Sequence, residues 1–182
     1  MSVAVYVMPI STWVSGRFRT VWGPDGAGGP SAPTRSPEEV QLLLERFREN
    51  LDRLVVPRAE WDEDGPARSA TIFSLEGFSR PVELAQRWSY RLKLPRLGAL
   101  EPPQIWLPVE FDPVFRIAAP WKPESEVTVA SSASVLADLV RLEEAILKEE
   151  RPELEETERV AQRLRESAEL GLRHRAPVIL ES

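Results

Sequence analysis

The sequence predicts a single α+β domain in which a mixed or antiparallel sheet is covered mainly on one face by about four helices. Its 182 residues fit one hydrophobic core, and no internal repeat or linker divides them. Strand-like and helix-like segments alternate only in part along the chain, whereas a fully parallel sheet requires regular alternation. We therefore expect one domain over residues 1–182, with a flexible loop at about residues 23–35.

The N-terminal third contains two predicted strands and one loop. Val3–Met8 is rich in Val and Tyr, and Arg17–Trp22 alternates charged with apolar residues, so both patterns indicate strands. Gly23–Pro33 is dense in Gly and Pro, which oppose regular structure. We expect a mobile surface loop there, with a lid over a binding site as the alternative.

The first long helix is predicted to begin at Pro37 and to end before Pro57. Ser36 is a good N-cap, Pro37 suits the first helical position, and Glu39 completes a capping box. Apolar residues then recur at spacings of three and four, which predicts one buried stripe. The stripe consists of Val40, Leu43, Leu44, Phe47, Leu51 and Leu54.

The remaining elements follow from the same patterns. Ser79 and Pro81 are predicted to open a second helix that ends at Pro95, and Gly171 is predicted to terminate the last helix. The other helices are expected over residues 134–150 and 153–170, the first with Leu147 facing inward. Strands are expected over residues 70–75, 104–110, 114–118, 127–130 and 177–180. The last strand follows two helices, which leaves it free to insert between earlier strands.

Composition restricts the partners and the compartment. The chain has no cysteine, which suits a reducing compartment, and no apolar run long enough to span a bilayer, so we expect a soluble cytoplasmic protein. Its net charge is −6, and the excess lies after residue 100, where seventeen acidic and ten basic side chains fall. No segment forms a basic stripe, which argues against nucleic acid as a partner. The twenty Arg against three Lys and the seventeen Pro fit a GC-rich bacterial genome.

Catalytic candidates are few. Glu110 and Asp112 are two residues apart on a predicted strand, so their carboxylates are expected on one face, where they could bind Mg²⁺ or divide acid and base roles. The alternative is an ordinary Asp-Pro turn. His174 is the only histidine, and a capping or surface role competes with a role as general base. We predict no metal site and no cofactor.

Binding candidates are aromatic and acidic. Trp61 and Trp121 lie beside charged residues or Pro, as expected for interface anchors, although such residues also pin loops onto a core. Glu143, Glu150 and Glu155 belong to an acidic tract across the last two helices. That tract predicts either a solvated helix face or a surface that docks a basic partner.

These residues favour binding over catalysis. We expect a bacterial protein-binding module of the immunity, adaptor or accessory type, which uses exposed aromatics and an acidic C-terminal face. Two alternatives stay open. One is a small enzyme with a carboxylate-based, metal-assisted site, and the other is an oligomeric structural component whose aromatic surface is buried between copies.

Overall fold

A six-stranded mixed sheet runs through the molecule in the order β2-β1-β6-β3-β5-β4. The computed structural model describes residues 2–14, 36–54, 60–63 and 65–182. The strands are β1 (Ser2–Val7), β2 (Ser69–Ser74), β3 (Gln104–Leu107), β4 (Phe115–Ala119), β5 (Lys122–Ser131) and β6 (Val178–Glu181). Among them β3 and β5 run parallel, and the other neighbouring pairs run antiparallel. The predicted α+β class with a mixed sheet is confirmed.

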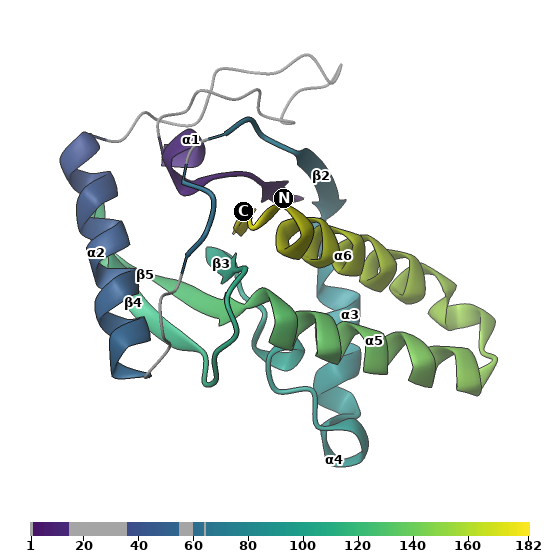
Figure 1. The fold of residues 1–182 in the computed structure, drawn as a ribbon. Coiled ribbons are helices and arrows are strands. Elements are labelled where there is room, and N and C mark those ends of the chain that lie inside the picture. Colours follow the sequence, from purple (N-terminus) through teal and green to yellow (C-terminus); the bar gives the residue numbers. More distant parts are fainter. Residues whose placement is uncertain (1, 15–35, 55–59, 64) are drawn as a thin grey trace.

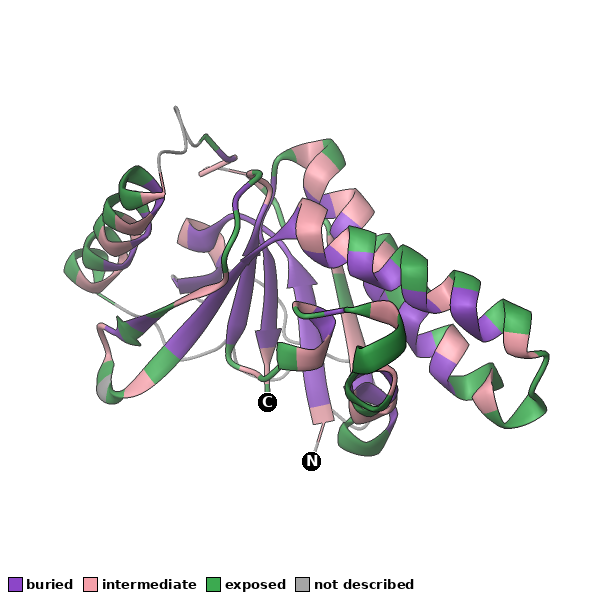
Figure 2. Ribbon diagram, turned by 90° about the horizontal axis from the view of Figure 1, so that it is seen from below, coloured by how far each residue is buried: buried purple, intermediate pink, exposed green. Residues whose placement is uncertain are grey.

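The last strand lies inside the sheet. β6 pairs with β1 on one side and with β3 on the other, so it connects strands β2 and β1 with strands β3, β5 and β4. All three strands are almost completely buried (Figure 2). The last strand is therefore inserted between earlier strands, an arrangement that the sequence allowed.

Helices cover the two faces of the sheet unequally (Figure 1). One face of the sheet is covered by α3 (Leu75–Arg87), α5 (Ser132–Glu149) and α6 (Glu155–His174). The opposite face is covered by α1 (Ile10–Val14) and α2 (Pro37–Arg53). Side chains of a strand alternate between faces. Val3, Val5 and Val7 accordingly lie in the core between the sheet and α3, α5 and α6, which we call the first core. Ala4 and Tyr6 lie in the core between the sheet and α1 and α2, which we call the second core.

Helix α2 begins where its sequence predicts. The hydroxyl of Ser36 accepts the backbone N–H of Glu39 at 3.2 Å, and the Glu39 carboxylate accepts the N–H of Ser36 at 2.8 Å. This reciprocal capping box satisfies two donors that the helix itself leaves free. Leu43, Phe47 and Leu51 are buried against the sheet, so the predicted stripe is the packed face.

Helix α3 begins earlier than predicted. Ser74, not Ser79, is its N-cap and accepts the N–H of Gly77 at 3.0 Å, which leaves Pro81 inside the helix. Gly and Pro are poor helix formers, and for that reason the local pattern placed the start too late. The turn that precedes the predicted start contains two buried residues, Gly77 and Phe78, and burial of the Phe78 ring in the first core accounts for the earlier start.

Helix α6 also continues beyond its predicted end. Gly171 lies inside the helix, which ends at His174 with Arg175 in the left-handed conformation, φ 52°. A Cβ atom at Gly171 would lie 2.9 Å from the carbonyl oxygen of Ala176 and 2.9 Å from a Val178 methyl. Glycine is therefore required here for close packing against β6, and not for a helix cap.

Two further predictions have different outcomes. The strands expected over 114–118 and 127–130 form one hairpin, in which β5 extends back to Lys122 and pairs with β4. The strand predicted at Arg17–Trp22 and the loop at Gly23–Pro33 lie outside the described residues. No described helix is long and apolar enough to cross a membrane.

Candidate functional site

Glu110 and Asp112 do not form a carboxylate pair on a strand. β3 ends at Leu107, so both residues lie in the connection that follows it. Glu110 is exposed, while a carboxylate oxygen of Asp112 lies 2.6 Å from a guanidinium nitrogen of Arg96. The expected placement of both carboxylates on one face of a strand is therefore wrong, because the strand ends before them and Arg96 engages Asp112.

His174 lies in a different environment. It lines a shallow cavity of about 550 Å³ with Trp61, Asp62 and charged neighbours. Four of those neighbours form two ion pairs, since Arg48 contacts Glu63 at 2.7 Å and Arg175 contacts Glu60 at 3.3 Å. No hydrogen bond or ion pair between described residues joins His174 to Glu110 or Asp112.

The described residues do not assemble a metal centre. No three histidine, aspartate or glutamate side chains among them lie close enough to hold a metal ion. The three catalytic candidates are distributed over two separate places, the connection after β3 and the end of α6. A reaction that requires them to act together has no support in this arrangement.

The two tryptophans expected at a binding surface differ in exposure. Trp61 is 8 % exposed and meets Phe47 edge to face, with ring centroids 6.4 Å apart. It therefore packs the 60–63 segment onto the second core and offers little area to a partner. Trp121 is partly exposed at the β4–β5 turn and contacts Trp13 edge to face at 5.5 Å. Trp121 remains a binding candidate.

The most exposed described aromatic is Tyr90, at 84 %. It lies on the short helix α4 (Ser89–Leu92), beside Arg91, whose guanidinium lies 5.0 Å from the centre of the Trp88 ring. Arg91 also reaches Glu149 at the end of α5, at 2.7 Å. This ion pair joins α4 to the C-terminal end of α5. Sequence reasoning missed Tyr90 because it considered only tryptophan among the aromatic residues.

The acidic tract lies on a helical hairpin. Helices α5 and α6 pack side by side and extend beyond the sheet, joined by the 3₁₀ turn η2 (Pro152–Leu154) (Figure 1). Glu150 and Glu155 lie at its tip, exposed and without an ion pair to any described residue. Leu147, predicted to face inward, is instead 62 % exposed, and Val140, seven residues earlier, is 38 % exposed. Helix α5 thus has apolar side chains on its outer surface.

Glu143 has a structural position. Its side chain is 18 % exposed between α5 and α6, where Arg165 contacts it at 3.0 Å and also contacts Glu169 at 2.6 Å. Burial raises the pKa of the Glu143 carboxyl above its usual value, and the Arg165 charge opposes that effect. Glu143 therefore joins the two helices and does not belong to the exposed docking face that we expected.

Charge reversal separates these two kinds of glutamate. We expect Glu143→Lys to lower the free energy of unfolding by about 1–3 kcal/mol, because it places a lysine beside Arg165 in a partly buried site. Glu150→Lys should change it by less than about 0.5 kcal/mol, since that side chain is exposed and unpaired. Urea denaturation of both variants checks this. Equal effects would contradict the placement of Glu143 between the helices.

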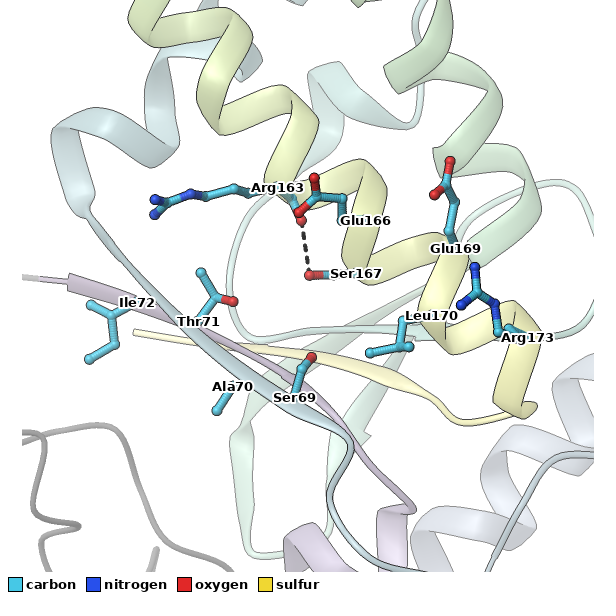
Figure 3. Close-up of a pocket in the computed structure, with 10 residues that line it drawn as sticks. All are labelled: Ser69, Ala70, Thr71, Ile72, Arg163, Glu166, Ser167, Glu169, Leu170 and Arg173. Atoms are coloured by element: carbon cyan, nitrogen blue, oxygen red, sulfur yellow. Dashed lines mark hydrogen bonds between the residues drawn. The ribbon is translucent and has the colours of Figure 1, made fainter.

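A second feature, not anticipated from the sequence, is a groove between β2 and α6. It has a volume of about 650 Å³ and is lined by the strand segment Ser69–Ile72 and by six residues of α6. The helix contributes Arg163, Glu166, Ser167, Glu169, Leu170 and Arg173. Figure 3 shows Thr71 pointing from the strand towards the helix and Arg163 extending over the space beside the strand. The hydroxyl of Ser167 donates to the Arg163 carbonyl oxygen at 3.0 Å, within the helix.

Comparison with known proteins adds no functional information. No family model, no curated protein and no solved structure matches this chain. The candidate surfaces are therefore judged on their geometry and charge.

Proposed function

We propose that this protein is a protein-binding module, of the bacterial adaptor, immunity or accessory type, that docks a basic partner through the outer surface of α5. We define the α5 surface by Val140, Glu144, Leu147 and Glu150. The observation that carries the proposal is the exposure of Leu147 and Val140, at 62 % and 38 %, seven residues apart on one face of α5. Large exposed apolar and aromatic side chains with a polar rim are typical of interfaces.

Charge supports the choice of a basic partner. Glu144 and Glu150 lie three residues before and after Leu147, so they flank it on the helix surface. Both are exposed, and neither forms an ion pair with a described residue. Carboxylates at the rim of an apolar contact attract a basic partner from solution and reject an acidic one. The cysteine-free sequence supports a reducing compartment such as the cytoplasm as the place of binding.

Capture from a lysate of the source cell tests this proposal, with the full chain as bait. A double variant, Val140→Ser with Leu147→Ser, should reduce recovery of the specific partner by about tenfold or more, because it removes both exposed apolar side chains of the α5 surface. The control is Leu42→Ser, which changes a leucine of 39 % exposure on α2. Recovery is quantified by mass spectrometry at low and high salt.

The salt dependence and the control decide the result. The proposal requires that high salt also reduces recovery, since screening weakens contacts between exposed charges. It is overturned if the double variant and Leu42→Ser recover the same proteins in the same amounts. A chain that forms dimers, and whose dimers the double variant dissociates, would instead identify a second copy as the occupant of this surface.

A further inference from the structure

The two edge strands of the sheet are covered differently. At one edge, the Arg46 side chain of α2 donates to the Ala118 carbonyl oxygen of β4. At the other edge, backbone groups of β2 from Ser69 to Phe73 bond to β1 and to no other described residue. An uncovered edge strand presents free N–H and C=O groups that can pair with another extended chain.

The groove beside this edge has the dimensions of a strand-binding site. Its lining continues into a smaller cavity of about 200 Å³, since both contain Ile72 and Arg163. Together they extend along β2 from Ser69 to Ser74, six residues, or about 20 Å at the rise of an extended chain. Register places Ser69 and Thr71 opposite Val7 and Val5, whose side chains join the core on the α6 side. Helix α6 thus forms one wall and β2 the other.

The helix wall of this groove has an excess of unpaired positive charge, unlike the chain as a whole. Residues 159, 163, 166, 170 and 173 follow one another at spacings of four and three, so they share one face of α6. Three of them are arginines (Arg159, Arg163 and Arg173), and none of the three forms an ion pair with a described residue. Glu166 is a carboxylate on the same face, and Gln162 donates to it at 3.3 Å. Glu156 and Glu169 also line the two cavities, but each is ion-paired with an arginine outside them, Glu156 with Arg80 and Glu169 with Arg165. Three unpaired guanidinium groups therefore face one unpaired carboxylate, Glu166.

We propose that the groove between β2 and α6 binds an extended acidic segment of a partner protein, which adds to β2 as a further strand. Main-chain hydrogen bonds to the β2 edge supply affinity, as in other complexes that extend a sheet. Alternate side chains of the segment face α6, where carboxylates can form bidentate pairs with the arginines. Leu170, partly exposed on the same face of α6, offers an apolar contact between these charges.

This inference is independent of the α5 surface. The two sites differ in sign, because the hairpin surface is acidic and the groove is basic, so they select different partners. A partner with separate acidic and basic regions would contact both, and avidity would then couple the two sites. Loss of binding at one site leaves the test of the other unaffected.

Direct titration with short peptides tests the groove. The probes are a fluorescein-labelled peptide of six residues that alternates Glu with Val, the corresponding Lys–Val peptide, and a Glu–Val peptide N-methylated at every residue. We expect saturable fluorescence polarisation with the first peptide alone, because the second has the wrong charge and the third cannot donate to the strand edge. NMR amide shifts should change at Ser69–Ile72 and along the facing turns of α6.

Variants identify the charges involved. Arg163→Glu should weaken binding of the Glu–Val peptide at least tenfold and reduce its dependence on salt. Arg53→Glu on α2 is the matched control, since Arg53 is exposed and unpaired with any described residue, and it should leave binding within about twofold. Circular dichroism and thermal unfolding show whether each variant is folded.

Four outcomes overturn the proposal. They are the absence of saturable binding up to millimolar peptide, equal binding of the Lys–Val peptide, equal loss in Arg163→Glu and Arg53→Glu, and unimpaired binding of the N-methylated peptide. Tighter binding of a single-stranded oligonucleotide that displaces the Glu–Val peptide would assign the groove to nucleic acid instead.

Discussion

Replacing Phe47 by alanine should lower the free energy of unfolding by about 3–5 kcal/mol. The side chain is completely buried between α2 and the sheet, and its ring meets Trp61 at 6.4 Å with an angle of 80° between the planes. Alanine removes the ring and leaves a cavity that the rigid neighbouring strands cannot fill. The loss also releases Trp61, so the 60–63 segment should become less firmly held.

Two leucines of the same helix provide a comparison for the Phe47 prediction. Leu44 is only partly buried against the second core, so Leu44→Ala should cost about 1–2 kcal/mol. Leu42 is 39 % exposed, and Leu42→Ala should cost less than about 0.5 kcal/mol. Urea denaturation with linear extrapolation measures all three variants. A cost below about 1 kcal/mol for Phe47→Ala would show that α2 is not docked as described.

The features that the sequence predicted correctly depend on neighbouring residues alone. The Ser36–Glu39 capping box and the stripe around Leu43 are contained within one helix, and the structure contains both. The strand at Val3–Met8 was recognised from its β-branched residues and differs from β1 by one residue at each end. Such signals do not require knowledge of the partner element.

The errors arose where a distant contact determines the local structure. Gly171 has the sequence pattern of a helix terminus, yet its lack of a side chain accommodates Ala176 and Val178. Pro81 has the pattern of a helix start, yet burial of its neighbours carries α3 back to Leu75. Local propensity cannot predict either outcome, because the deciding atoms belong to another element or to the core.

The candidate sites show the same limit. The sequence shows spacings of four, three, four and three along α6 between Arg159, Arg163, Glu166, Leu170 and Arg173. A groove exists there only because β2 is an edge strand beside that helix. Strand order follows from pairing across the whole chain, which single-segment patterns do not contain. Likewise, the acidic tract divides into paired Glu143 and free Glu150 only after α5 and α6 pack.

A buried carboxylate, Asp138, was not among the candidates and should have a large effect on stability. It is 1 % exposed on α5, and one of its oxygens accepts the backbone N–H groups of Arg96 at 2.8 Å and Leu97 at 3.1 Å. Asp138→Ala leaves both donors without their acceptor. We expect a loss of about 2–4 kcal/mol, since each unsatisfied buried donor costs about 1–3 kcal/mol.

Asp138→Asn should behave differently and in a pH-dependent way. Its amide oxygen can accept both N–H groups, and it carries no charge to desolvate. Burial raises the pKa of the Asp138 carboxyl above 3.8, more than the two backbone hydrogen bonds and the nearby Arg96 lower it. The folded protein therefore holds this proton more tightly than the unfolded chain does.

The sign of the pH dependence follows from that raised pKa. The stabilising contribution of the protonated form is complete below the unfolded pKa and is lost as the pH rises through the folded pKa. Relative to the wild type, Asp138→Asn should thus gain stability between about pH 3.8 and the raised folded pKa, and remain constant above it. Urea denaturation across this pH range measures the difference. A difference of the opposite sign would show that the hydrogen bonds from Arg96 and Leu97 outweigh burial, and that the charged carboxylate stabilises the contact between α5 and η1 (Leu97–Ala99).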